Sequence, residues 1–290
     1  MIAMASFVVG ALCSWLLWSA LEPQFTGAPQ VLRQNYRGVL IPVAAGIVVV
    51  LAVVLVGTVF RLWERYGGIG VGDIERDSTI LFGGTVGFGL IGLLDDLVGG
   101  AATRGFAGHL GALRHGRVTT GLVKLVWGVL FGMLAVPGDL GVPGDLGDSV
   151  LAGLLIAASA NLANLFDRAP GRMVKVSLFG GVVVVALGAP AWQLTGPLLV
   201  LGAGAGMLVL DLRERCMLGD TGANVLGAAV GYGLVISLEP TGQWAALAVV
   251  VVLNLASEFV SFTRVIDAVA PLRWLDRLGS LPERRTSNTG

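Results

Sequence analysis

Three short polar strings interrupt an otherwise apolar chain, and their side chains are the candidates for chemistry. They are Leu93-Leu94-Asp95-Asp96, Asn161-Leu162-Ala163-Asn164-Leu165-Phe166-Asp167 and Leu218-Gly219-Asp220-Thr221-Gly222-Ala223-Asn224. Carboxylates and amides beside a membrane are energetically costly, so they usually mark function. Their oxygen atoms suit Mg²⁺, which typically needs only one or two carboxylates together with substrate phosphates and water. If the strings meet, they predict metal-assisted phosphoryl chemistry at the membrane surface.

The spacing within the second and third strings suits a cation and a phosphate. Asn161, Asn164 and Asp167 are three residues apart, so they form one slowly turning stripe on a predicted helix. The stripe lies in the last turns, where free carbonyls and the negative dipole end favour a cation. Asp220 lies at the start of another predicted helix, whose free N–H groups suit a phosphate. Five basic residues flank the same surface and could hold a diphosphate: Arg168, Arg172, Lys175, Arg213 and Arg215.

The composition indicates that membrane helices position these strings. Of the 290 residues, 55% are hydrophobic and only 13% are charged, whereas a soluble domain carries about 25% charged residues. The formal net charge is zero, so nothing points to a nucleic-acid partner. Cys13 and Cys216 lie in different segments and have neither disulfide nor zinc spacing.

Nine apolar runs are read as segments that cross about 30 Å of hydrocarbon. We interpret them as helices, because an open sheet would leave unpaired backbone groups in lipid. The predicted fold is an all-α polytopic membrane bundle in one domain, residues 1–282. A polar tail, residues 283–290, is expected to be disordered. The predicted spans are residues 2–21, 39–61, 78–97, 118–137, 149–167, 175–190, 195–211, 221–238 and 244–262.

The distribution of Lys and Arg predicts the orientation of these spans. Of the 19 Lys and Arg residues, 16 fall on one side of the arrangement and the other three, Arg61, Arg65 and Arg76, fall on the opposite side. Positive residues mark the cytoplasmic side. We therefore expect the amino terminus outside and the carboxy terminus inside, which places all three polar strings at the cytoplasmic boundary.

Each string also has a purely structural interpretation. Asp220 could act only as a helix N-cap, and Asp95-Asp96 could be a solvated helix end. Asn161 and Asn164 are harder to explain in this way, because two amides on one face of a membrane helix need partners. Helix packing could supply those partners. The conjunction of the three strings at one face favours function over these interpretations.

In order and spacing, the strings resemble the motifs of the polyprenyl-phosphate N-acetylhexosamine-1-phosphate transferases. Members of that superfamily carry an Asp-Asp pair at an inner helix end, then a G-L-x-x-x-K-L string, an N-x-x-N-L-x-D-G-x-D-G string and a G-D-T-G string. The counterparts here are Asp95-Asp96, Asn161 to Gly171, and Gly219-Asp220-Thr221-Gly222, while Gly121-Leu122-Val123-Lys124-Leu125 matches the second string loosely. The resemblance covers nearly the whole chain, and four motifs in order are a specific signal.

The resemblance implies a phosphoglycosyl transferase that moves a sugar-1-phosphate from a UDP-sugar to undecaprenyl phosphate and releases UMP. It implies that Asn164 and Asp220 hold Mg²⁺, with Mn²⁺ as an alternative ion. The implied catalytic residues are Asp95, Asp96 and Asp167, one of the first two acting as a base near the lipid phosphate. The implied substrate-binding residues are Lys124, Asn161, Arg168, Arg172 and Arg273.

The same resemblance implies a multi-pass protein of the bacterial plasma membrane that serves cell-envelope glycan synthesis, with a homodimer as one oligomeric state to consider. The chain departs from the superfamily pattern at two places. Pro170 replaces the second Asp of D-G-x-D-G, which removes a donor contact, and a histidine cluster of one branch is absent from residues 270–276. These departures indicate a divergent branch.

The departures also support a second hypothesis, in which the chain is a non-catalytic relative. Such a relative would bind the polyprenyl-phosphate carrier and act as a partner in envelope assembly. The retained Asp95, Asp96, Asn164 and Asp220 oppose it. A transporter is disfavoured, because the charges gather at one surface rather than at the midplane expected for transport.

Overall fold

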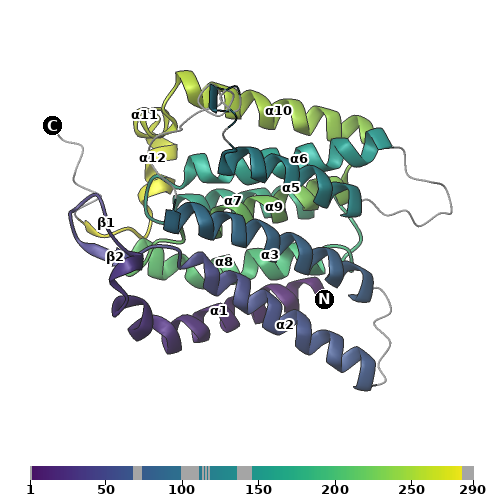
Figure 1. The fold of residues 1–290 in the computed structure, drawn as a ribbon, viewed down its shortest axis with the longest axis horizontal. Helices are drawn as coiled ribbons and strands as arrows, with labels where there is room; N and C mark the ends of the chain where they lie inside the picture. Colours follow the sequence, from purple (N-terminus) through teal and green to yellow (C-terminus); the bar gives the residue numbers. More distant parts are fainter. Residues whose placement is uncertain are drawn as a thin grey trace.

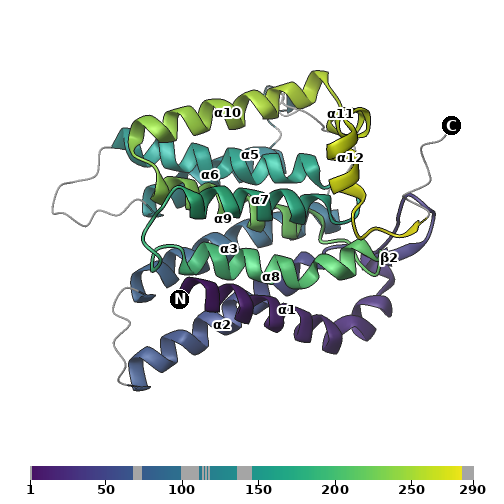
Figure 2. The ribbon, with the colours of Figure 1, turned by 180° about the vertical axis from the view of Figure 1, so that it is seen from behind.

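The computed structural model describes residues 2–67, 74–98, 111–112, 114, 116, 118–135 and 146–282, and within them the chain is helical apart from one short hairpin. The long helices lie side by side in one bundle (Figures 1 and 2). The all-α prediction is confirmed, while the predicted tail at 283–290 lies outside the described residues. The elements are α1 (Ile2–Thr26), η1 (Pro29–Val31), β1 (Leu32–Gln34), β2 (Leu40–Pro42), α2 (Gly46–Gly67), α3 (Ile74–Val98), α5 (Thr120–Ala135), α6 (Leu146–Phe166), α7 (Arg172–Ala186), α8 (Thr195–Leu212), α9 (Gly219–Ser237), α10 (Pro240–Phe259), α11 (Phe262–Ala268) and α12 (Ala270–Arg277).

Each predicted apolar run overlaps one long helix of the bundle. Among the described residues, five of these helices, α1, α2, α6, α8 and α10, are long and apolar enough to cross a membrane. The chain is therefore a multi-pass membrane protein. Helices α5 and α7 have only 16 and 15 residues, short of the roughly 20 that a span needs. The count of nine spans and the orientation of the termini stay predictions.

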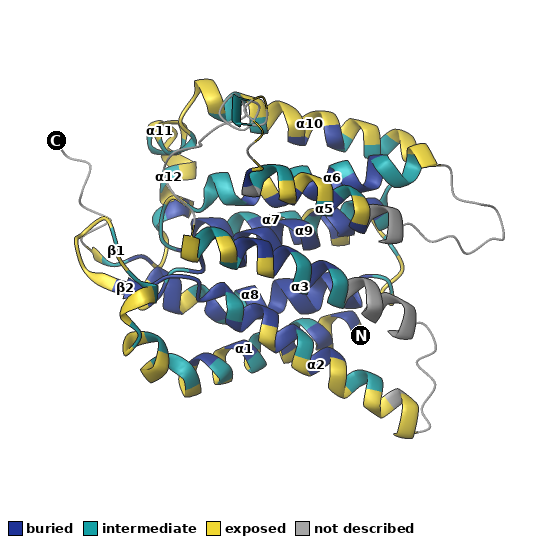
Figure 3. Cartoon of the chain, in the orientation of Figure 1, coloured by how far each residue is buried: buried dark blue, intermediate teal, exposed yellow. Residues whose placement is uncertain are grey.

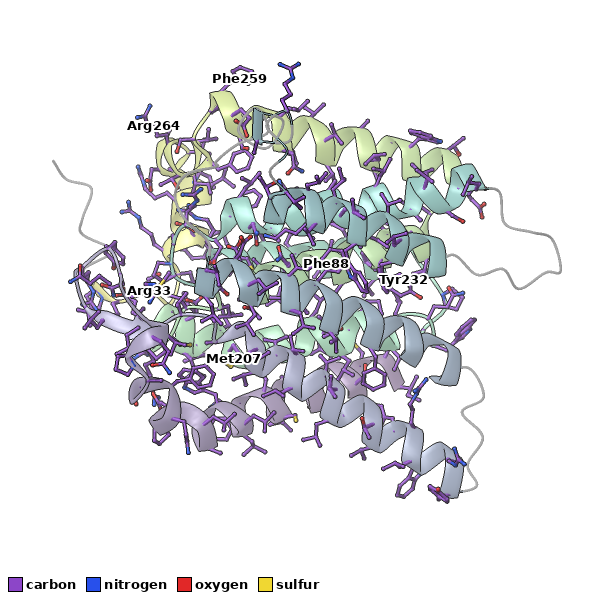
Figure 4. All side chains as sticks on the ribbon, in the orientation of Figure 1. Arg33, Phe88, Met207, Tyr232, Phe259 and Arg264 are labelled. Atoms are coloured by element: carbon purple, nitrogen blue, oxygen red, sulfur yellow. The ribbon has the colours of Figure 1, made fainter. Side chains whose placement is uncertain are left out.

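The predicted helix over residues 39–61 was wrong at its start, which is a strand. Strand β2 pairs antiparallel with β1, with Leu40 opposite Gln34 and Pro42 opposite Leu32. Proline disfavours the helical conformation for the residue before it, so the chain stays extended through Ile41. Helix α2 begins only at Gly46. The resulting hairpin lies at one end of the bundle, and its Arg33 and the Arg264 of α11 lie at the same end (Figure 4).

Helices α8 and α9 form the centre of the bundle, and α10 forms its edge. Most side chains of α8 and α9 are buried, whereas only Leu247 and Val250 of α10 are buried (Figure 3). Next to α9, Phe88 of α3 packs edge-to-face against Phe131 of α5, with ring centroids 6.1 Å apart. Because α3, α6, α7 and α8 all pack on α9, the first turn of α9 is surrounded by other helix ends.

The two short C-terminal helices fold back onto the start of α7. Arg172 is buried and donates from Nε and Nη2 to the two carboxylate oxygens of Asp276, at 2.7 and 2.9 Å. Its Nη1 donates to Thr263 Oγ1 at 2.8 Å. Lys175 Nζ donates to three backbone carbonyls at the end of α12, where a cation also suits the helix dipole. These bonds hold α11 and α12 against the bundle.

Replacing Arg172 by Met is expected to release α11 and α12, because Asp276 would lose both hydrogen bonds of its buried ion pair. Breaking one partner of a buried pair typically costs about 3–5 kcal/mol. The expected result is a lower thermal midpoint and faster proteolysis within residues 260–282. Arg277→Met is the matched control, because its pair with Asp267 is partly exposed and such pairs contribute about 0–1 kcal/mol. Equal effects of the two substitutions would contradict this account.

Candidate functional site

The three polar strings meet at one end of the bundle. The first ends α3, the second ends α6 and the third begins α9. Asn164 Nδ2 on α6 donates to Asp220 Oδ2 on α9 at 3.1 Å. The carboxylate of Asp96 on α3 accepts the backbone N–H of Asp220 at 2.9 Å. The three strings thus contact one another directly at one end of the bundle, and the side of the membrane that this end faces stays a prediction.

Asp96 caps α9 from another helix. Its Oδ1 accepts the N–H of Asp220, and its Oδ2 accepts both the N–H and the hydroxyl of Thr221, at 2.9 and 2.6 Å. The residue at the N-cap position itself, Leu218, supplies no side-chain cap. The N-cap interpretation of Asp220 is therefore not needed. With Asp96 satisfying the first N–H groups, the carboxylate of Asp220 is left for other partners.

Two glycines allow this capping geometry. Gly219 has φ +67°, a conformation that favours glycine, and a Cβ there would lie 2.5 Å from Asp96 Oδ1. On α3, a Cβ at Gly92 would lie 2.4 Å from the carbonyl oxygen of Asp220. Both positions therefore need glycine for α3 to reach the start of α9. This explains the first glycine of the G-D-T-G string in structural terms.

Lys124 lies between two carboxylates. Its Nζ is 2.8 Å from Asp95 Oδ2 and 3.0 Å from Asp220 Oδ2. The Lys124 side chain is 8% exposed, and the Asp220 side chain is 37% exposed, so the cluster can be reached from solvent through Asp220. The two adjacent aspartates on α3 thus have different partners: Asp95 faces this ammonium group, and Asp96 faces the start of α9.

The cluster can be tested for its fit to a cation. The side-chain oxygen of Asn164 is buried and has no hydrogen-bond partner, although its amide nitrogen is bonded to Asp220. Across the described ranges, no three His, Cys, Asp or Glu side chains are grouped as metal ligands. A cation here would therefore rely on few carboxylates, amide oxygens and substrate phosphates. That is the ligand set that suits Mg²⁺.

A cleft of about 250 Å³ opens beside the cluster. Asp167 lies in its wall, in the turn that follows α6. Burial raises the pKa of the Asp167 carboxyl well above its usual range, and the nearby carboxylates of Asp211 and Asp220 act in the same direction. Its protonated form therefore persists at pH values where an exposed aspartate is ionised. The cleft is lined by Asn35, Tyr36, Ile41, Asp167, Arg168, Ala169, Pro170, Asp211, Glu214, Cys216 and Met217.

The hairpin is held over this cleft by one buried carboxylate. Glu214 follows α8 and is 6% exposed, with a φ of +55°. It accepts hydrogen bonds from Asn35 Nδ2, Tyr36 Oη and Arg37 Nε, at 2.7, 2.7 and 2.8 Å. These three consecutive residues connect the two strands. Glu214 therefore fixes the position of Tyr36, which is itself part of the cleft wall.

Several predicted site residues lie away from the cluster. Asn161 donates to Asn254 Oδ1 of α10 at 2.6 Å, so it serves helix packing. The guanidinium of Arg172 is used by Asp276 and Thr263, and Arg273 donates to the carbonyl of Asp267. Arg168 is exposed and lines the cleft. The structure therefore brings together Asp95, Asp96, Lys124, Asn164 and Asp220, with Asp167 and Arg168 beside them.

Two acidic residues of this region, Asp211 and Glu214, were missed by the sequence analysis. Asp211 is buried and accepts the N–H of Gly171 at 2.9 Å, which ties the end of α8 to the start of α7. Both acids fall in the D-L-R-E-R string at residues 211–215. The arginines of that string were interpreted as orientation signals and as possible ligands of a diphosphate. Two acids within a basic loop were the signal available.

Comparison with known proteins shows that the sequence is similar to that of a characterised class of transferase. The chain is 33% identical, over 228 residues, to the phospho-N-acetylmuramoyl-pentapeptide-transferase of Moorella thermoacetica. The match covers 72% of this chain and 69% of that protein. No protein-family model matches the chain. The similarity therefore extends over most of both chains.

Proposed function

Because the chain belongs to the polyprenyl-phosphate N-acetylhexosamine-1-phosphate transferase superfamily, we propose that it transfers a sugar-1-phosphate from a UDP-sugar to a polyprenyl phosphate. The observation that supports this most strongly is the contact set around Asp220. There, Lys124, Asn164 and the Asp96-capped start of α9 converge. The proposed location is the cytoplasmic face of a bacterial plasma membrane, and the proposed acceptor is undecaprenyl phosphate.

In this proposal each residue of the cluster has a separate role in the transfer. Asp220 and the side-chain oxygen of Asn164 would hold Mg²⁺, which would neutralise charge on the diphosphate of the donor and so stabilise the departure of UMP. Lys124 would bind a phosphate oxygen. Asp95, at the end of α3, would accept the proton of the lipid phosphate. Asp96 would act as a positioning residue, because both of its oxygens are bonded to the start of α9.

The cleft beside the cluster is the proposed place of the nucleoside part of the donor. Its lining combines apolar side chains with a few polar groups, as small-molecule sites commonly do. Tyr36, Asp167 and Arg168 lie in its wall, and Asp167 is close enough to Asp220 and Asp96 for their charges to raise its pKa. The donor would then reach the cluster with its diphosphate.

The direct test is a donor panel. Purified full-length protein is incubated with undecaprenyl phosphate, Mg²⁺ and a series of radiolabelled UDP-sugars, and both UMP and lipid-linked sugar are measured. The proposal expects stoichiometric formation of the two products from at least one donor. If no donor gives either product while the lipid still binds, the transferase proposal fails.

The second candidate is a non-catalytic relative that binds the polyprenyl-phosphate carrier. Two observations favour it: Pro170 in the cleft wall replaces an expected acid, and Arg172 is fully engaged by Asp276 and Thr263. In the donor panel, this candidate predicts lipid binding without UMP release from any donor. We prefer the transferase proposal, because a protein that only binds the lipid carrier would not need the ion pairs that Lys124 forms with Asp95 and Asp220.

A further inference from the structure

Asn224 on α9 is buried in a way that its surroundings do not explain. Its side chain is completely inaccessible. Neither its oxygen nor its nitrogen has a hydrogen-bond partner. Buried polar groups are nearly always paired, and each exception calls for an explanation. A leucine of similar size would fill the space without leaving two polar atoms unpaired.

The place of Asn224 in the helix links it to the cluster. It lies four residues after Asp220, so the two side chains share one face of α9. Side chains on a helix lean toward its N-terminus, which directs Asn224 toward the turn that carries Asp220. The next residue on that face, Gly227, is pressed against α6, where a Cβ would lie 2.5 Å from the carbonyl oxygen of Ser159. Asn224 is therefore enclosed on the membrane side of the cluster.

A second unpaired amide oxygen belongs to the cluster itself. The side-chain oxygen of Asn164 is buried without a partner, and Asn164 is bonded to Asp220 through its nitrogen. Two unpaired amide oxygens thus accompany one carboxylate. Amide and carboxylate oxygens are the ligands that Mg²⁺ and Mn²⁺ take in proteins.

We propose that Asn224 supplies a further ligand to the cation site, on its membrane side, so that the site consists of Asp220, Asn164 and Asn224. The inference rests on the proposed function, because it adds a residue to the cation site of that proposal. The nitrogen of Asn224 is then available to donate to a phosphate oxygen that shares the cation. This role would explain why an amide is present in an otherwise apolar helix interior.

The test measures Mn²⁺ binding to the full-length protein in detergent, by electron paramagnetic resonance of the free ion. Asn224→Leu is expected to weaken Mn²⁺ binding at least about tenfold, while the thermal midpoint without metal stays equal or rises. Asn224→Asp is expected to lower the midpoint without metal and to give a larger Mn²⁺-induced rise than the wild type. Ser237→Ala is the matched control, because Ser237 Oγ is also buried and unpaired but lies at the other end of α9.

The outcomes separate this inference from the proposed function. Mn²⁺ binding that is lost in Asp220→Asn but unchanged in Asn224→Leu would overturn the role of Asn224 alone. Binding that is unchanged in Asp220→Asn, or absent in the wild type, would overturn the cation site of the proposed function as well. If Asn224→Leu does not fold, Asn224→Asp decides, and a Mn²⁺-induced rise no larger than that of the wild type overturns the inference.

Discussion

Lys124→Met is expected to lower kcat/KM for sugar-phosphate transfer by about 100-fold, the usual cost of losing one charged donor to a transition-state phosphate. The same substitution is expected to strengthen the binding of Mn²⁺. In the structure the ammonium group lies between Asp95 and Asp220, 2.8 and 3.0 Å from their oxygens. Lys124 therefore stands where a cation would be attracted. Removing the ammonium group ends its competition with Mn²⁺ for the two carboxylates. It also ends the electrostatic repulsion between the ammonium group and the ion.

The check for Lys124 combines two measurements on the same protein. Mn²⁺ affinity is measured by titration, and kcat/KM is measured by UMP release with the donor found in the panel. Lys175→Met is the matched control, because Lys175 donates to backbone carbonyls at the end of α12. Weaker or unchanged Mn²⁺ binding in Lys124→Met would show that the ammonium group does not compete with the cation.

Asp96→Asn is expected to reduce both stability and activity, whereas Asp95→Asn is expected to reduce activity with a smaller loss of stability, because Lys124 keeps its pair with Asp220. Asp96 accepts three hydrogen bonds from the first turn of α9. An Asn would direct an N–H₂ group at some of those donors, which costs about 1–3 kcal/mol. The resulting displacement of Asp220 would lower kcat/KM by about 100-fold, because small misplacements have effects of that size.

The two aspartate variants are compared by thermal unfolding and by kcat/KM for UMP release. The account expects a larger fall in the midpoint for Asp96→Asn than for Asp95→Asn, with low activity for both. A lower midpoint for Asp95→Asn together with a stable Asp96→Asn would exchange the roles of the two residues.

The meeting of the three polar strings could be predicted from the sequence, because it depends on quantities that a sequence contains. The lengths of the apolar runs predict where the helices end. The charges of the loops predict that the ends carrying the three strings lie on the same side of the membrane. These two predictions are enough to bring Asp95, Asn164 and Asp220 to one end of the bundle. The general all-α architecture follows from the same reasoning, because membrane segments leave few alternatives to helices.

The partners of each side chain could not be predicted, because they depend on how the helices are rotated against one another. Asn161 and Asn164 are three residues apart, yet one faces Asn254 of α10 and the other faces Asp220. Arg172 finds Asp276 more than a hundred residues later in the chain. Such long-range pairs leave no periodic signal in a single sequence.

The hairpin was missed for a local reason. Its strands have only three residues each, and the second continues directly into the apolar run of α2. A window long enough to detect a membrane helix therefore absorbs Leu40–Pro42. Pro42 was the available signal, since a proline that ends an extended stretch argues against a helix through that position.

The central claim is that Asp220 organises a cation site on which sugar-phosphate transfer depends. The most direct test is to measure UMP release as a function of Mg²⁺ concentration, for the wild type and for Asp220→Asn, at the same undecaprenyl phosphate and UDP-sugar concentrations. The account predicts a saturable rise for the wild type from no activity in EDTA, and at least about a 1000-fold lower rate for Asp220→Asn. UMP release that persists in EDTA, or that is equal in the two proteins, would contradict it.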